Sequence, residues 1–395
     1  MAMIMMTTDD CAAKPGEARL SPRLAKFLDD TRLPTPFLAI DADVVAARLD
    51  DLRHAFPGAE ILYAAKANPL PEVLATIARD GAGGDVASAA EIRDCLAAGF
   101  PPDRLSFGNT IKRPDDVAMA HALGITRFTV DSPNELEKVA RLAPGARVLV
   151  RILVDTVGAQ WPLSRKFGCH PDMAVELLRR APDLGLQPEG LAFHVGSQQV
   201  DPTQWEGPLA TCAAVAARVR RDGVRLETIN LGGGFPARYT SPVPGIDEYG
   251  RAIRRAVERH FGRRPPHLIV EPGRALVAEA GVLVTSVLLV SRKARTDLHQ
   301  WAYLDCGKFG GLAETADEAI RYPIVAPRRQ QLDVPTILAG PTCDSADILY
   351  ERVPYQLPAD LTEGDQLRIL SAGAYTFTYA SVGFNGLPPL RPVVL

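Results

Sequence analysis

The sequence of 395 residues lacks an apolar run near the roughly 20 residues that a membrane-spanning helix needs. It also lacks a surplus of basic residues, since 44 Lys and Arg against 47 Asp and Glu leave a net charge of −3. This balance argues against a nucleic-acid partner. The six cysteines form no CxxC pair or His/Cys cluster, which argues against a metal site or a disulfide framework. These absences predict a reduced, cytoplasmic protein with no membrane partner.

The N-terminal sequence, MAMIMMTTDDCAAKPGE, lacks the basic and apolar regions of a secretory signal. We therefore expect residues 1–20 to form a mobile tail. The whole sequence has 47% hydrophobic and 23% charged residues, as in ordinary globular proteins with a large core. Its length predicts one large domain and a smaller one.

Short strand-like runs alternate with helix-like runs from about residue 59 to 275. One helix start is well marked, with Ser132 at the N-cap, Pro133 in the first turn and Glu135 at the capping-box position. The eight strand-like runs are AEILYAAKA, GDVAS, RLSFGNT, RFTVD, ARVLVRILV, GLAFHVG, TINLGGG and HLIVEPG. Eight such units predict an α/β fold, a (β/α)8 barrel over residues 42–275, with a doubly wound open sheet as the alternative.

The pattern changes after Arg274. Runs such as AGVLVTSVLLVSRKA, QWAYLDCG and VPTILAGP are β-rich, are separated by Pro/Gly turns and show little helical period. We expect residues 276–395 to form a mainly antiparallel β-domain, to which residues 21–41 contribute through the strand-like run TPFLAID.

Polar residues and glycines recur at the ends of the predicted barrel strands, where barrel enzymes place their active sites. They are Lys66, Asp85, Asn109, His194, Gly232, Gly233, Gly234 and Glu271. The run LGGGF follows the seventh strand and EPGR the eighth, where backbone N–H groups unobstructed by side chains can approach a phosphate.

A family resemblance agrees with this interpretation. The motifs YAAK, FHVGSQ, GGGFP, EPGR, GPTCDSADIL and GAYTFTYASVGFNG occur in this order between about residues 33 and 388. They resemble the pyridoxal-phosphate-dependent decarboxylases of the alanine-racemase-like fold, and among these the ornithine/lysine decarboxylases. The resemblance implies a barrel plus a β-domain, a pyridoxal phosphate cofactor and a homodimer with shared active sites.

Lys66 by itself is a commonplace lysine, but the resemblance makes it the amine that holds the cofactor as an aldimine. The resemblance also implies that Glu271 contacts the pyridine nitrogen of the cofactor. A carboxylate at this place favours decarboxylation, whereas the arginine that the racemases have there would not. An isolated histidine such as His194 is usually an ordinary core residue. The resemblance implies instead that its imidazole stacks on the cofactor ring. The other cofactor-binding residues that it implies are Asp85 (equally a structural acid), Glu91, Ser197, Gly233, Gly234, Gly273, Arg274 and Tyr375.

Cys343 on its own would be a small buried hydrophobe. The resemblance makes it the acid that protonates the substrate carbon after carbon dioxide leaves, with Asp344 binding the distal ammonium. Both would reach the cofactor of the other subunit. Asp317 aligns with a second amine-binding acid of the family, and Glu318 is its rival because the register over 312–322 is uncertain.

The expected reaction is decarboxylation of L-ornithine to putrescine, or of L-lysine to cadaverine. The alternatives on the same fold are diaminopimelate, arginine or a carboxylated polyamine as substrate. A non-enzymatic regulator that binds the cofactor is a further alternative, although such relatives normally lose residues that are present here as Lys66, Cys343 and Asp344.

Overall fold

The computed structural model describes residues 20–155, 157–161, 166–327 and 332–395, so the predicted tail lies almost entirely outside the described residues. The described chain forms two compact units. We call residues 45–236 and 243–276 the barrel unit, and residues 20–44, 237–242 and 277–395 the sheet unit. Within the described residues, no helix has the length and apolar character needed to cross a membrane.

Eight parallel strands close into a barrel in the order β10-β11-β2-β3-β4-β5-β6-β8. They are β2 (Glu60–Ala64), β3 (Gly83–Val86), β4 (Leu105–Phe107), β5 (Arg127–Val130), β6 (Arg147–Arg151), β8 (Gln187–Ala192), β10 (Thr228–Asn230) and β11 (His267–Val270). The closed sheet confirms the predicted (β/α)8 barrel over the open-sheet alternative. Its interior contains an apolar cluster of Leu62, Leu149, Ala192 and Ile269, each at most 5% exposed.

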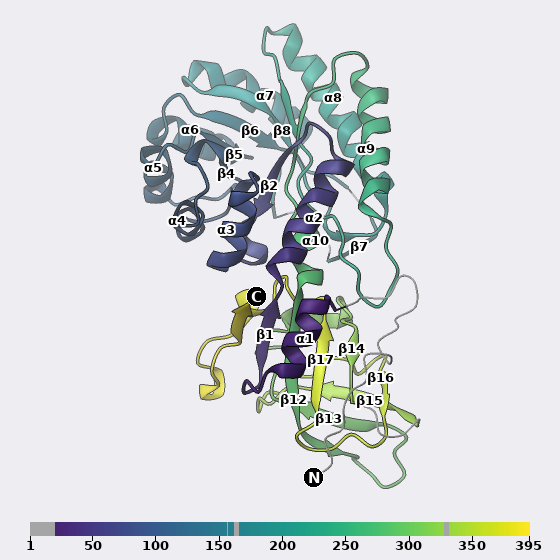
Figure 1. Cartoon of the computed structure of the whole chain (residues 1–395). Helices are drawn as coiled ribbons and strands as arrows, with labels where there is room; N and C mark the ends of the chain where they lie inside the picture. Colours follow the sequence, from purple (N-terminus) through teal and green to yellow (C-terminus); the bar gives the residue numbers. More distant parts are fainter. Residues whose placement is uncertain (1–19, 156, 162–165, 328–331) are drawn as a thin grey trace. The chain divides into compact units, whose positions relative to one another are not determined.

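Helices surround the barrel strands (Figure 1). They are α2 (Ala42–Ala55), α3 (Pro71–Arg79), α4 (Ala89–Ala97), α5 (Pro114–Ala122), α6 (Pro133–Leu142), α7 (Pro171–Asp183), α8 (Glu206–Arg221) and α9 (Ile246–Phe261). The predicted start of α6 is confirmed, because the Ser132 Oγ accepts the N–H of Glu135 at 3.4 Å. The Glu135 carboxylate does not complete the capping box but contacts Lys112 at 3.1 Å and Lys138 at 2.5 Å.

The sheet unit contains eight strands, with a main path β14-β17-β12-β13-β15-β16 and with β1 between β12 and β18. They are β1 (Phe37–Ile40), β12 (Gly281–Ser291), β13 (Gln300–Leu304), β14 (Ile324–Val325), β15 (Asp333–Ala339), β16 (Tyr355–Pro358), β17 (Gln366–Leu370) and β18 (Arg391–Val394). Most pairs are antiparallel, as predicted, but β1–β18 and β13–β15 are parallel.

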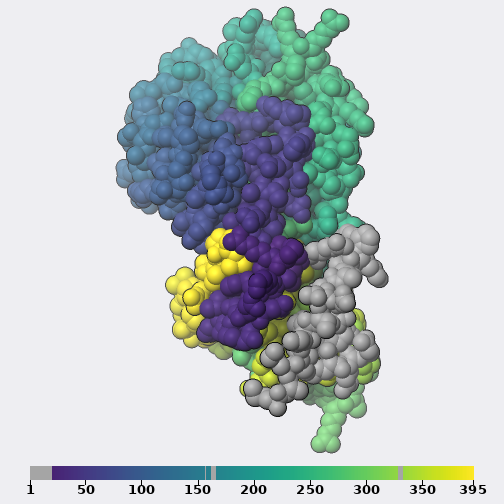
Figure 2. Space-filling model, viewed as in Figure 1, coloured from purple at the N-terminus to yellow at the C-terminus, as the bar shows by residue number. Residues whose placement is uncertain are grey.

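The early run TPFLAID does join this sheet, since Phe37 to Ile40 pair with Val284 to Gly281. The β1–β18 pair brings the N-terminal and C-terminal ends of the unit together, and Figure 2 shows these purple and yellow segments in contact. Helix α1 (Pro22–Asp30) was not predicted, and its Leu24 and Leu28 pack into the core of the unit beside Phe37.

Candidate active site

Lys66 lies just beyond β2, in the short turn η2 (Ala65–Ala67). Its Nζ is 2.9 Å from the Oδ2 of Asp85, which belongs to the neighbouring strand β3. The Asp85 side chain is 7% exposed and the Lys66 side chain 46% exposed. The amine is therefore held by a buried carboxylate and is still accessible to a small molecule.

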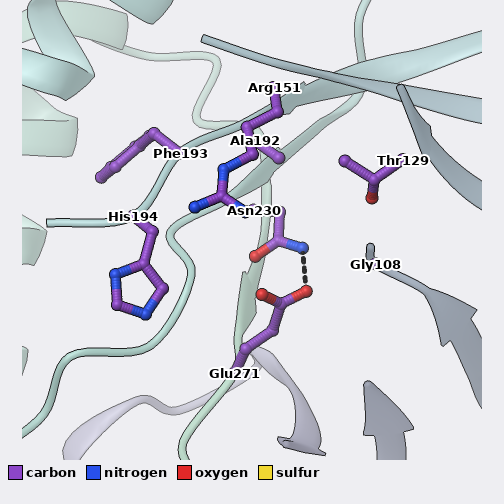
Figure 3. Close-up of a pocket in the computed structure, with 8 residues that line it drawn as sticks. All are labelled: Gly108, Thr129, Arg151, Ala192, Phe193, His194, Asn230 and Glu271. Carbon is purple, nitrogen blue, oxygen red and sulfur yellow. Dashed lines mark hydrogen bonds between the residues drawn. The ribbon is translucent and has the colours of Figure 1, made fainter. Parts of the chain in front are cut away.

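A pocket opens at the carboxyl ends of the barrel strands (Figure 3). The residues that line it come from six strands or the residues that directly follow them: Gly108, Thr129, Arg151, Ala192, Phe193, His194, Asn230 and Glu271. The structure thus brings the predicted His194 and Glu271 together at the end of the barrel where active sites lie.

Glu271 follows β11 and is held by the last residue of β10. Asn230 donates from Nδ2 to the Glu271 Oε1 at 2.5 Å, while its own Oδ1 accepts the N–H of Gly232 at 2.9 Å. Burial and the negative charge of Asp85 raise the pKa of Glu271 to about 7, although Asn230, Lys66 and Arg151 act in the opposite direction. This carboxyl group can therefore exist in either protonation state near neutral pH.

His194 follows β8 and is kept neutral. Burial, and then the positive charges of Arg151 and Lys66, hold the pKa of His194 well below its usual value. The Nδ1 atom accepts the N–H of Gly196 at 3.0 Å, so the single proton of the neutral ring belongs on Nε2. The site thus presents an uncharged, oriented imidazole.

The glycine run after β10 allows close approach of backbone. A Cβ on Gly233 would lie 2.5 Å from the Glu271 carbonyl oxygen, and one on Gly234, whose φ is +97°, would lie 2.3 Å from the Gly196 carbonyl oxygen. Arg274, 3% exposed, follows Gly273 and begins α10 (Arg274–Val277). It donates to the Oγ of Ser197, at the start of β9 (Ser197–Gln199), at 3.1 Å. A buried guanidinium, a hydroxyl and glycine backbone are suitable donors for an anion.

Glu91 has a largely structural environment. Ser88 caps α4 by accepting the Glu91 N–H at 3.3 Å, and the Glu91 Oε2 accepts the Ala87 N–H at 2.7 Å. Burial raises the pKa of Glu91. The sequence motif DVASAAE therefore makes the turn between β3 and α4, next to Asp85.

The remaining predicted residues belong to the sheet unit. Cys343 and Asp344 lie on one loop after β15, both exposed, and the Asp344 Oδ1 accepts the Ala346 N–H at 2.8 Å. Tyr375, at a φ of +55°, has its ring centroid 5.6 Å from that of Tyr379.

Asp317 and Glu318 are consecutive residues in the left-handed region, with φ of +53° and +58°. Such conformations are rare for residues with side chains and often mark functional sites.

Six of the eight pocket residues were not predicted, among them Arg151 and Asn230, which interact with Glu271. Each is the last residue of its strand, in β6 and β10 respectively. The rule that selected Lys66 and Glu271 missed them because the predicted strands ARVLVRILV and TINLGGG extend beyond the true strand ends. Arg151 lies within a predominantly apolar run. Asn230 lies just before a glycine run, and the prediction selected the glycines instead.

The barrel and the pocket at its carboxyl end define a barrel enzyme with donors for an anionic ligand. Residues 42–278 match the family model described as the pyridoxal-binding domain of pyridoxal-dependent decarboxylases. The chain is 34% identical over 379 residues to a lysine/ornithine decarboxylase of Selenomonas ruminantium, covering 95% of this chain and 93% of that one. It is also 34% identical over 382 residues to a diaminopimelate decarboxylase of Actinosynnema pretiosum, covering 91% and 84%.

The fold is similar to a solved lysine/ornithine decarboxylase from Vibrio vulnificus complexed with putrescine, with a TM-score of 0.85 and 32% identity over 95% of this chain and 99% of that one. The chain belongs to the pyridoxal-dependent decarboxylases. This confirms the predicted family, the enzyme class and the pyridoxal phosphate cofactor.

The residues of the barrel unit fit this cofactor. Glycine at 233 and 234 lets this turn pack against the carbonyls of Glu271 and Gly196, where a Cβ would clash. The buried Arg274 and the hydroxyl of Ser197 are the donors that a phosphate requires. Lys66 has an accessible amine with which an aldehyde could react, and Glu271 lines the pocket as an acid that could face a ring nitrogen.

Proposed function

We propose that the protein decarboxylates a small basic amino acid, with L-ornithine as the preferred substrate and L-lysine the second. The observation that carries the proposal is Glu271, a carboxyl group in the pocket held by Asn230 at 2.5 Å. An acid beside the ring nitrogen supports loss of carbon dioxide, whereas a cation there would oppose it. The Vibrio relative that binds putrescine, the product of ornithine decarboxylation, supports the substrate class.

Pyridoxal phosphate, when bound, supplies an aldehyde that takes up an amine and a ring that accepts the electron pair of a broken bond to carbon. Lys66 is the attaching amine, and Asp85 at 2.9 Å orients it. Arg274, Ser197 and the Gly234 backbone would bind the phosphate. Glu271 would keep the ring nitrogen protonated, and the neutral His194 would pack against the ring without adding a charge that competes with this proton.

Cys343 supplies the proton that replaces the lost carboxyl group, and Asp344 and Asp317 bind the distal ammonium of the substrate. The choice of Asp317 over Glu318 rests on their contacts. Glu318 is 12% exposed, and its two carboxylate oxygens already accept from Arg321 at 2.8 Å and from the Arg352 N–H at 2.6 Å. Asp317 is 85% exposed, with a surface pair to the Arg352 guanidinium at 3.0 Å.

The proposal includes a homodimer in which Cys343 and Asp344 act at the cofactor of the other subunit, as the sequence resemblance implies. It also places the enzyme in the reducing cytoplasm. The support for this is that the five cysteines among the described residues are all free thiols.

A substrate panel tests the proposal. Holoenzyme is given ornithine, lysine, diaminopimelate and arginine, and carbon dioxide and amine are measured to obtain kcat/KM for each. We expect the highest value for ornithine, with lysine lower by about 10-fold to 200-fold, as expected for one methylene of pocket depth. The Lys66→Ala variant is the negative control, because it should lose both the absorption band of the bound cofactor and the turnover of every substrate.

Diaminopimelate is the second candidate substrate, because the Actinosynnema relative is as similar in identity as the Selenomonas one. Its second carboxylate would have to lie near Asp344 and Asp317, where like charges repel it. Turnover of diaminopimelate at least equal to that of ornithine would contradict the preferred substrate.

Asp317→Asn and Glu318→Gln separate the two rival acids. We expect Asp317→Asn to raise the KM for ornithine, because it removes a charge that faces the ammonium. Glu318→Gln should mainly lower stability, since it weakens bonds to Arg321 and to the Arg352 backbone. The reverse pattern of KM and stability would assign the role to Glu318.

A further inference from the structure

The loop that carries Cys343 is organised by a buried acid. The Asp347 carboxylate, in a residue that is 2% exposed, accepts the Lys308 N–H at 2.7 Å and the Thr342 hydroxyl at 2.8 Å. A Cβ on Gly307 or Gly340 would come within 2.3 Å or 2.2 Å of its oxygens, so only glycine leaves room for this acid. The backbone on either side of Cys343 is thereby fixed to the turn at 307–308.

The side chain of Cys343 has its own partner. The Asn385 Oδ1 accepts the Cys343 N–H at 3.2 Å, and the Asn385 Nδ2 lies 3.3 Å from the Cys343 sulfur as donor. The orientation of the amide follows from chemistry, because a backbone N–H can only donate and must face the oxygen. One planar amide therefore spans the backbone and the thiol of the same residue.

Asn385 is itself held in place. Its φ is +52°, a left-handed conformation that asparagine tolerates better than most residues. The preceding Phe384 packs its ring 5.2 Å from that of Phe309, and the Ser381 N–H donates to the Phe309 carbonyl at 2.8 Å. Lys308, the neighbour of Phe309, bonds Asp347. The Cys343 loop and the Asn385 segment thus rest on the same turn.

We propose that Asn385 is a positioning residue for Cys343, which fixes the direction of the thiol and stabilises the negative charge that develops on sulfur as its proton leaves. This inference rests on the proposed function, in which Cys343 donates the proton to the substrate carbon. An amide that holds both the backbone and the sulfur restricts the thiol to one direction, and a fixed donor orientation raises the efficiency of proton transfer.

Alkylation of Cys343 by iodoacetamide measures this effect without reference to turnover. The thiolate is the nucleophile, so a group that stabilises charge on sulfur accelerates the reaction. The other cysteines among the described residues, Cys95, Cys169, Cys212 and Cys306, are buried. Holoenzyme carrying Cys11→Ser is the background, and mass spectrometry identifies the modified residue.

Two substitutions separate the two bonds. Asn385→Leu has a similar size and loses both. Asn385→Asp keeps an acceptor for the Cys343 N–H but replaces the donor to sulfur by a negative charge. Asn134→Ala, at an exposed asparagine in α6, is the matched control. Asn385 is also exposed, and its φ of +52° is tolerated by aspartate better than by leucine. Circular dichroism checks the folding of both variants, and if Asn385→Leu fails, Asn385→Asp carries the test.

We expect Asn385→Leu to slow alkylation by about 3-fold to 10-fold, the value of one ordinary hydrogen bond. Asn385→Asp should slow it more, and added salt should partly restore its rate because salt screens the new charge. The Asn134→Ala variant should match the background. Rates in both Asn385 variants that equal or exceed the background would overturn the inference.

The result is distinguishable from a failure of the proposed function. Cys343→Ala should slow turnover and yield some aldehyde through protonation at the wrong carbon. Unchanged turnover and product in Cys343→Ala, with slower alkylation in the Asn385 variants, would remove the acid role and keep the positioning contact. A crippled Cys343→Ala with unchanged alkylation in the Asn385 variants would remove the positioning role alone.

Discussion

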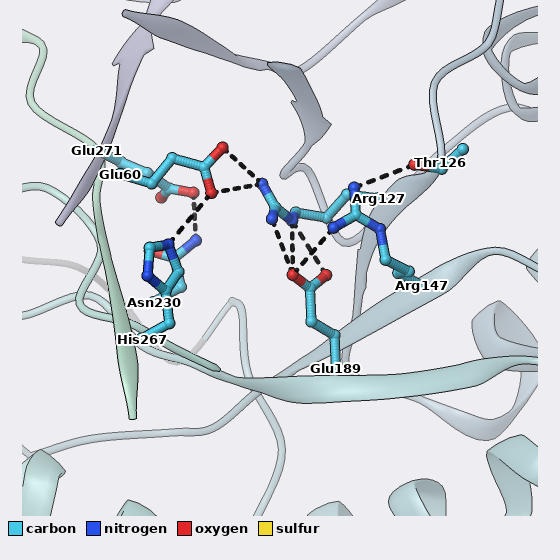
Figure 4. Close-up of polar contacts among 8 residues, drawn as sticks. All are labelled: Glu60, Thr126, Arg127, Arg147, Glu189, Asn230, His267 and Glu271. Atoms are coloured by element: carbon cyan, nitrogen blue, oxygen red, sulfur yellow. Dashed lines mark hydrogen bonds and ion pairs between the residues drawn. The ribbon is translucent and has the colours of Figure 1, made fainter. Parts of the chain in front are cut away.

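Buried charged groups are stabilised by ion-pair partners at one end of the barrel and destabilised by burial at the other. At the amino ends of the strands, Arg127 at the start of β5 donates to Glu189 at 2.8 Å and to Glu60 at 3.1 Å (Figure 4). Arg147 adds a further contact to Glu189 at 3.3 Å. Burial would lower the pKa of Arg127, but the hydrogen bonds and charges of Glu189 and Glu60 outweigh it and raise the pKa.

At the carboxyl ends of the strands, the Glu271 carboxylate receives a hydrogen bond from the neutral amide of Asn230. Its pKa is raised to about 7, first by burial and then by Asp85. Burial also lowers the pKa of Arg151, in the same pocket. The lesson is that the amino end uses charge to stabilise the fold, whereas the carboxyl end holds charge at a cost in stability, as a site prepared for a ligand does.

Arg127→Met should break the network at the amino end and produce the largest effect. It leaves Glu189 and Glu60 without their central cation, and the loss of one partner from a buried ion pair costs about 3–5 kcal/mol. Urea unfolding measures this loss, while kcat at 25 °C should be unchanged because Arg127 lies at the other end of the barrel. Arg179→Met is the control, since its pair with Asp222 is exposed and should be worth less than about 1 kcal/mol. Equal losses in the two variants would contradict the contrast.

Glu271→Gln should have the opposite effects, a loss of activity and a gain in stability. Loss of the acid that we propose to act at the ring nitrogen should reduce kcat by about 10²-fold to 10³-fold, with cofactor still bound through its phosphate. The folded-state pKa of Glu271 is about 7, above the usual 4.5, so this group lowers stability progressively as the pH rises from about 4.5 to about 7, and the loss is complete above that value. The apo-variant should therefore be more stable than the apo-protein at pH 8, by roughly 1–3 kcal/mol.

The stability gain of Glu271→Gln should disappear near pH 4, where the carboxyl group is protonated in both the folded and the unfolded chain. Urea unfolding of the cofactor-free proteins at the two pH values measures it. A loss of stability at pH 8, or an undiminished turnover number, would show that the carboxyl end is built like the amino end.

The contrast also explains what could be predicted from the sequence. The carboxyl-end residues Lys66, His194 and Glu271 stand out because each interrupts or ends an apolar run, and a parallel barrel brings strand ends together. The network at the amino end was not predicted, because Glu60, Arg127 and Glu189 look like solvated charges at strand starts. Only closure of the barrel brings them into contact.

In the sheet unit, alternation of apolar residues indicated strands but not their partners. The parallel pair of β1 with β18 joins residues 37–40 to 391–394, and no local pattern encodes such a pairing. The choice between Asp317 and Glu318 likewise depends on Arg321 and Arg352, whose contacts with these acids become visible only in the folded chain.

The Asn230→Leu variant should have the smallest effect of the three, and it tests whether Asn230 tunes the charge of Glu271 at the carboxyl end of the barrel. The Asn230 hydrogen bond lowers the pKa of Glu271. Its loss should raise that pKa further above about 7, by about one pH unit, since a hydrogen bond to a charged group is worth about 1.5–3 kcal/mol and part of this is recovered by water. The fall in stability with rising pH begins near the unfolded pKa of about 4.5 in both chains, but in the apo-variant it should continue about one pH unit further before it levels off, so the two stability curves should diverge above about pH 7.

Urea unfolding of the Asn230→Leu protein across pH 5 to 9 measures this displacement, and the pH profile of kcat/KM in the holoenzyme provides a second readout. The double variant Asn230→Leu/Glu271→Gln is the control, because without the acid no displacement of the stability curve remains. Stability curves that differ by a constant amount at every pH would mean that Asn230 acts through packing alone and does not tune the charge of Glu271.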